Sequence, residues 1–263
     1  MKKQQHLRIL AAALTLAFCI LGSSSALAAP AATPTTRPEK EVVEPNDTTQ
    51  TSLDYLEFLL HTGGPFRFQE AASKHPADDA DAAPAEGAVA ALTIYSQTTN
   101  NTEPIDTSGH SFVAVRNVSD HAIEVGGQEI APGTGVTIGT RANRPEHEGI
   151  WYNLEGYYCY YISDFYQNLY SMQVSLDEDG LAVLNQNLTT ADHWSTAFNC
   201  SSFAAGLWNS VCSDRLSAGT PHSPKGLKAS IRSYGGKLRY NESVPYDYIV
   251  SYGTARTPSA DYS

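Results

Sequence analysis

The chain has 263 residues, and its 28 acidic residues outnumber its 17 basic residues to give a formal net charge of −11. Nucleic acid and anionic membrane surfaces repel such a chain, so nucleic-acid binding is excluded as a function. The length is sufficient to bury a hydrophobic core without disulfide bonds.

The first 29 residues have the order of a secretory signal peptide. Lys2, Lys3 and Arg8 precede an apolar run, and small residues follow it at 25–29. The run is too short for a stable membrane span, although an uncleaved anchor is the alternative. We therefore expect a secreted, extracellular bacterial protein, close to the cell wall or free of it, that has no stable membrane insertion after cleavage.

Residues 30–88 predict a flexible leader before the folded domain. Prolines are scattered through its first part without an apolar period, and the residues from 71 onward are rich in Ala, Asp and Pro. Apolar residues at 53–61 predict a short helix between these two parts. The folded domain is expected over 89–253, followed by a loose tail over 254–263.

Short β-branched and aromatic segments predict an antiparallel sheet. These segments are 91–97, 110–117, 122–125, 128–130, 135–140 and a closing stretch at 244–252. The Gly126-Gly127 dipeptide suits a hairpin turn. Residues 151–170 contain one tryptophan and seven tyrosines. These aromatic side chains either cover one face of the sheet or line a substrate groove.

Apolar periodicity predicts helices in the second half of the chain. They are expected over 176–188, from Cys200 onward, and from Ser223-Pro224 onward. Strands followed by helices predict an α+β fold, in which an antiparallel sheet packs against helices on one side.

Three cysteines remain after the signal peptide, namely Cys159, Cys200 and Cys212, and an odd number leaves at least one thiol unpaired. On one helix, Cys200 and Cys212 would lie about 18 Å apart, and a disulfide needs Cα atoms within about 7 Å. A Cys159–Cys212 bridge would leave Cys200 free. Three unpaired cysteines are the alternative.

Cys200 and His110 are the candidate nucleophile and base. The first turn of a helix favours a thiolate, because its unpaired N–H groups and its dipole attract negative charge. His110 follows Ser108-Gly109 at the start of a strand, where a cleft opens and where it can accept a proton. The alternative is a structural cysteine and a surface histidine. His193 either borders the same cleft or lies in a surface loop.

The segment Gly109–Val115, with sequence GHSFVAV, is followed far downstream by NCSSFA at Asn199–Ala204. Together they resemble the circularly permuted branch of the NlpC-type papain-like superfamily, which includes lecithin:retinol acyltransferase-like proteins. In that branch the histidine strand precedes the cysteine helix, as it does here. The resemblance covers about residues 89–252. It implies a permuted papain-like fold in which the Cys200 thiol attacks a carbonyl, His110 transfers the proton and the Cys200 backbone N–H holds the oxyanion.

The resemblance also implies a third polar residue that orients the histidine. Gln128, Asn143 and His147 are the candidates, and His147 is preferred because a second imidazole recurs in this branch. Three further residues are predicted to contact substrate: Trp151, Tyr152 and Ser201.

The leading hypothesis is a secreted cysteine amidase or endopeptidase that acts on a peptide or peptidoglycan-like substrate. The alternatives are an acyltransferase or lipid-ester hydrolase with the same Cys–His pair, and a non-catalytic binding domain that uses the tyrosines. A Gly-x-Ser-x-Gly elbow is missing, which argues against a serine hydrolase. Zinc-ligand spacings and a calcium loop are missing as well, so neither a metal nor another cofactor is expected. The oligomeric state stays open.

Overall fold

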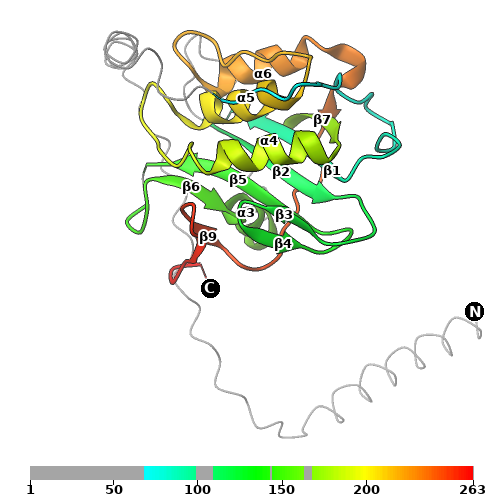
Figure 1. Ribbon diagram of the computed structural model, residues 1–263. Coiled ribbons are helices and arrows are strands. Elements are labelled where there is room, and N and C mark those ends of the chain that lie inside the picture. Colours follow the sequence, from blue (N-terminus) through cyan, green and yellow to red (C-terminus); the bar gives the residue numbers. More distant parts are fainter. Residues whose placement is uncertain (1–67, 99–108, 143, 163–167, 263) are drawn as a thin grey trace, which may run out of the picture. The chain divides into compact units, whose positions relative to one another are not determined.

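The computed structural model describes residues 68–98, 109–142, 144–162 and 168–262. The predicted signal peptide, the predicted helix at 53–61 and the candidate Asn143 lie outside these ranges. The element labels below are those of Figure 1.

An eight-stranded antiparallel sheet forms the centre of the fold (Figure 1). Its strand order is β10-β9-β6-β5-β2-β1-β7-β8. Its long central strands and their neighbours are β1 (Ala90–Gln97), β2 (His110–Asn117), β5 (Gly135–Arg141), β6 (Gly149–Tyr152) and β7 (Tyr170–Leu176). Its short outer strands are β8 (Arg239–Tyr240), β9 (Ser251–Tyr252) and β10 (Thr257–Pro258). The sheet and its helices confirm the predicted α+β class.

The predicted hairpin forms a separate two-stranded sheet of β3 (Ile123–Val125) and β4 (Gln128–Ile130). Gly126 and Gly127 both have positive φ angles, 56° and 79°. Glycine adopts positive φ angles without steric cost, which explains why both central positions of this turn are glycines.

Three helices cover one face of the sheet: α4 (Glu178–Leu188), α5 (Cys200–Val211) and α6 (Pro224–Arg232), with a short 3₁₀ helix η1 (Gly235–Lys237) after them. Each α-helix begins at a polar cap, since the side chains of Asp177, Asn199 and Ser223 accept hydrogen bonds from first-turn N–H groups. Their apolar sides meet alternate strand residues such as Val113 and Val115 in the main core.

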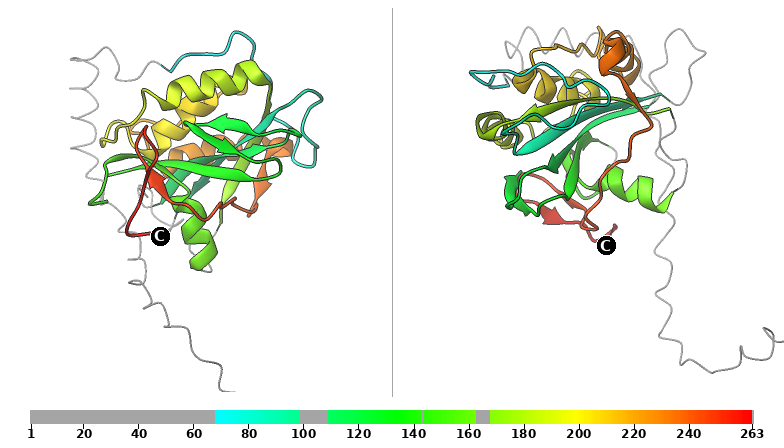
Figure 2. Two further views of the ribbon diagram at one scale, coloured as in Figure 1. Left: turned by 60° about the horizontal axis from the view of Figure 1, so that its bottom comes forward. Right: turned by 90° about the vertical axis from the view of Figure 1, so that its right-hand side faces the viewer.

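A further helix, α3 (Leu154–Tyr161), lies on the opposite face of the sheet (Figure 2). The prediction of helices on one side only is therefore wrong. The sequence of this helix is dominated by tyrosines and has a weak apolar period. Its residues Leu154 and Tyr158 are fully buried and pack with Trp151 and Val250 in a second core.

Residues 68–88 were predicted to be part of a flexible leader, and this is wrong. They form an extended strap that is held by hydrogen bonds to distant parts of the domain. Ala71 donates to the Ser210 carbonyl at 2.8 Å, and Asp78 donates to that of Gln173 at 2.8 Å. An alanine- and proline-rich segment has little apolar surface of its own, so its order comes from these backbone contacts.

The predicted loose tail is also ordered through Tyr262. Thr257–Pro258 pairs with β9, Ser259 is buried, and Tyr262 packs edge-on against Trp151 with ring centroids 5.9 Å apart. The predicted closing strand is correspondingly short: of 244–252, only Ser251–Tyr252 pairs in the sheet.

Candidate active site

Cys200 is the first residue of α5, so its thiol lies at the helix N-terminus, and the residue as a whole is partly buried. The Asn199 side chain accepts hydrogen bonds from the N–H groups of Ser201 and Ser202, and its carbonyl accepts from Phe203 at 2.9 Å. The cap therefore satisfies the N–H groups that follow Cys200. The N–H of Cys200 itself has no hydrogen-bond partner among the described residues, so it is open to an incoming acceptor.

His110 is the first residue of β2, and its ring is 3% exposed. Gly109 precedes it with φ 135°, and a Cβ there would lie 2.2 Å from the Gln97 carbonyl oxygen. Only glycine fits this entry into the strand. The imidazole stacks on Phe112 with ring centroids 5.8 Å apart. The glycine and the stacked ring together fix where the imidazole points.

The thiol meets the imidazole where two central strands separate. The pairing of β2 with β5 starts at Val113 opposite Ile138, so the first residues of β2 have no pairing partner in β5. The His110 imidazole and the Ser111 backbone lie close enough to the Cys200 thiol there to lower its pKa. The structure thus brings the predicted nucleophile and the predicted base together.

Glu155, on α3, holds the other side of the imidazole. Its Oε1 accepts a hydrogen bond from His110 Nε2 at 2.9 Å and another from Arg141 Nη2 at 3.2 Å. The Glu155 side chain is completely buried. Because Nε2 is bound to the carboxylate, Nδ1 is the ring nitrogen left for the thiol.

A glycine on β5 makes room for this carboxylate. A Cβ at Gly139 would lie 2.4 Å from Glu155 Oε1 and 3.1 Å from His110 Nε2. The Glu155 carboxylate therefore occupies the space over β5 where this strand carries no side chain. The sequence did not single out Glu155, but one signal was present. It is the sole acidic residue in the aromatic stretch 149–163.

Charges in the site favour an ionised pair. Burial acts to raise the pKa of the Cys200 thiol, but the charge and hydrogen bond of His110 and the Ser111 backbone outweigh it, so that pKa is lowered. Burial also acts to raise the pKa of Glu155. The hydrogen bond from His110 and the charge of Arg141 outweigh it and lower that pKa to about 2. The carboxylate stays ionised and stabilises positive charge on the imidazole.

A chain of buried serine hydroxyls fixes α5 against the strands. The Ser96 hydroxyl donates to the Pro224 carbonyl at 2.8 Å, so its oxygen must accept from Ser111 at 2.9 Å. The Ser111 hydroxyl must in turn accept from Ser201 at 3.3 Å. The proton of Ser201 is therefore committed to Ser111, and this hydroxyl offers lone pairs to the thiol 3.9 Å away.

His147 was the preferred third residue, and the structure places it in a different cluster. Its Nε2 donates to Asp192 at 2.7 Å, and its ring stacks on Tyr252 with centroids 5.3 Å apart. Asp192 also accepts from the N–H of Ile150 at 2.8 Å. The pair thus joins the loop before β6 to the segment between α4 and α5, and the place beside His110 belongs to Glu155. The other described candidate, Gln128, bonds Arg256.

The predicted substrate contacts are buried instead of lining a groove. Trp151 and Tyr152 are 0% and 1% exposed, and the Arg256 guanidinium covers the Tyr152 ring at 3.8 Å. Ser201 is fully buried in the serine chain. His193 is exposed in the loop that leads to α5.

All three cysteines of the described chain are free thiols, so the Cys159–Cys212 bridge is absent. Burial raises the pKa of Cys159 to about 12 and that of Cys212 to about 12. These two thiols stay protonated at neutral pH. The pKa of the Cys200 thiol is shifted in the opposite direction.

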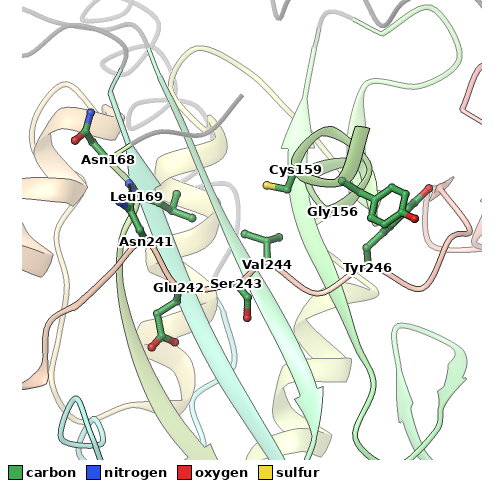
Figure 3. A pocket seen from close by; sticks show the side chains of 10 residues that line it. Gly156, Cys159, Asn168, Leu169, Asn241, Glu242, Ser243, Val244 and Tyr246 are labelled. Carbon is green, nitrogen blue, oxygen red and sulfur yellow. Dashed lines mark hydrogen bonds between the residues drawn. The ribbon is translucent and has the colours of Figure 1, made fainter. Parts of the chain in front are cut away.

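A pocket of about 640 Å³ opens on the α3 side of the sheet (Figure 3). In Figure 3 the side chains of Cys159, Leu169 and Val244 face one another across it. Tyr160 and Tyr246 form one wall, and polar residues of 241–243 form another.

Comparison with protein-family models, with curated proteins and with solved structures gave no match for this chain. Within the described ranges, no three His, Cys, Asp or Glu side chains are grouped so that they could hold a metal ion. No helix in this part of the chain has both the length and the apolar character to cross a lipid bilayer.

Proposed function

We propose that the protein is a papain-type cysteine hydrolase with Cys200 as nucleophile, His110 as general base and acid, and Glu155 as the residue that orients the imidazole. One observation carries the proposal. A thiol at a helix N-terminus lies beside an imidazole whose other nitrogen is bound to a buried carboxylate. This arrangement activates a nucleophile through a base that a third group holds in place.

The proposed reaction is acyl transfer to water. The thiol gives its proton to His110 Nδ1, and the sulfur attacks the substrate carbonyl carbon. The oxyanion that forms accepts a hydrogen bond from the Cys200 N–H, which is free of a partner among the described residues. The imidazolium returns the proton to the leaving amine, which leaves a thioester on Cys200. Water, deprotonated by the same imidazole, hydrolyses the thioester and restores the thiol.

The proposal includes a circularly permuted papain-like fold, because the histidine strand β2 precedes the cysteine helix α5 along the chain. It also includes export by the N-terminal signal peptide and action on peptide amide bonds outside the cell, with the cell wall as one source of substrate. The excess of acidic residues agrees with a substrate that is not a polyanion.

Thiol alkylation tests the catalytic assignment directly. The chain is treated with iodoacetamide at pH 7, and modified cysteines are identified by peptide mapping. We expect Cys200 to react at least tenfold faster than Cys159 and Cys212, whose pKa values are raised to about 12. A His110→Ala variant should lose this advantage, whereas a His147→Ala variant should keep it. Equal rates for Cys200 in all three proteins would remove the basis of the proposal.

A further inference from the structure

The pocket on the α3 side adjoins the catalytic imidazole through a stack of aromatic rings. His110 stacks on Phe112 at 5.8 Å, and Phe112 stacks on Tyr95 at 4.8 Å. Tyr95 packs in turn with Leu169 and Val244, which line the pocket. Direct packing of side chains on one face of the sheet therefore links the imidazole to the pocket lining.

One wall of the pocket offers unpaired backbone groups. The chain runs out of β8 into Glu242–Val244, and these three residues make no backbone N–H hydrogen bond to any part of the described chain. Ser243 is exposed, and its carbonyl accepts from the Tyr95 hydroxyl at 3.2 Å, which holds the segment in place. A fixed segment with open N–H groups is a template for an added extended chain.

One part of the pocket lining is apolar. Leu169, Val244 and Cys159 face its centre in Figure 3, and the Cys159 thiol is neutral because burial raises its pKa to about 12. The charged residue in the lining, Glu242, carries a carboxylate that points away from these three side chains in Figure 3. An uncharged side chain therefore fits this space best, and an anionic one is repelled.

We propose that this pocket is a substrate subsite that binds an extended peptide, pairing its backbone with Glu242–Val244 and taking one bulky aliphatic side chain between Leu169, Val244 and Cys159. The assignment of this pocket as a substrate subsite rests on the proposed function. A fatty acyl chain is the rival occupant, since it also fills an apolar pocket, but it leaves the open N–H groups without partners.

The test measures binding without turnover, in the full chain carrying Cys200→Ala. Three dye-labelled, end-capped hexapeptides of alanine and serine have leucine, alanine or aspartate at the third position, and sodium decanoate is the fourth probe. We expect the leucine peptide to bind at least tenfold more tightly than the alanine peptide and the aspartate peptide to bind weakest. Hydrogen exchange at the N–H groups of 242–244 should slow when the leucine peptide binds.

A Val244→Asp variant should abolish the preference for leucine. The matched control, Ile249→Asp, changes an exposed side chain of the same connecting segment that does not line the pocket, and should retain the preference. Urea midpoints show that both variants are folded. Equal binding of the three peptides, binding of decanoate alone, or a preference that survives Val244→Asp would overturn the inference. Alkylation of Cys200 in the native chain is independent of these outcomes, so the subsite and the catalytic assignment fail separately.

Discussion

Replacing Glu155 with glutamine removes a buried negative charge and keeps the shape of the side chain. The pKa of Glu155 falls from its ordinary value of 4.5 to about 2 in the folded protein. At about 1.4 kcal/mol for each pKa unit, the ionised carboxylate contributes on the order of 3 kcal/mol to stability. Since the folded pKa is the lower one, this contribution is complete above pH 4.5 and is lost as the pH falls through 2. Glutamine also leaves Arg141 buried without its anion.

Urea unfolding between pH 7 and pH 2 measures this contribution. We expect the difference in unfolding free energy between native protein and Glu155→Gln to be about 3 kcal/mol at pH 7 and to shrink steadily below pH 4.5. The exposed Glu178→Gln control should give a small and constant difference.

The same variant tests the role of Glu155 in the site. Without the carboxylate the imidazolium is less stable, so the pKa of the Cys200 thiol should rise and alkylation at pH 7 should slow. An unchanged pH profile of alkylation, together with a constant stability difference, would refute the assignment of Glu155 as the orienting residue.

Three further changes probe neighbouring features. Gly139→Ala should displace the Glu155 carboxylate, since the new Cβ lies 2.4 Å from Oε1; slower Cys200 alkylation and a loss of about 1–3 kcal/mol in urea unfolding are expected. Ser201→Ala should leave the pH profile of Cys200 alkylation unchanged, because the hydroxyl proton is committed to Ser111; a profile that moves to higher pH would show that the hydroxyl donates to the thiolate. Asn199→Ala should cost about 1 kcal/mol of unfolding free energy through the lost cap, and an unchanged urea midpoint would contradict the role given to this side chain.

Local sequence signals were sufficient to place Cys200 at the start of a helix and His110 at the start of a strand. Asn199 caps the helix that starts at Cys200, and Gly109 occupies the one backbone position before β2 that excludes a side chain. Both features can be recognised in the sequence because cap residues and glycines act on their immediate neighbours in the chain. The α+β class followed for the same reason, from strand and helix patterns along the chain.

Non-local contacts account for what the sequence did not reveal. The chain turns from β5 into β6 and then into α3, which brings Glu155 over β5. Gly139 leaves the space there that lets the Glu155 carboxylate reach His110. Neither condition is visible in the residues around Glu155. The strap at 68–88 was missed for a similar reason: its hydrogen-bond partners are distant in the sequence, such as Ser175 for the N–H of Ala85, 90 residues away, and Asp214 for the N–H of Ala77, 137 residues away.

The strap also limits where the N-terminal part of the chain can be cut without loss of contacts in the folded domain. Phe68 packs on α5 so closely that a side chain at Gly206 would meet its ring at 2.0 Å, and it lies 6.1 Å from the ring of Phe198, two residues before Cys200. A maturation protease that trims the N-terminus must therefore cut upstream of Phe68. A cut further along would remove part of the packing beside the N-terminus of α5, so we expect it to destabilise the site around Cys200 instead of activating it.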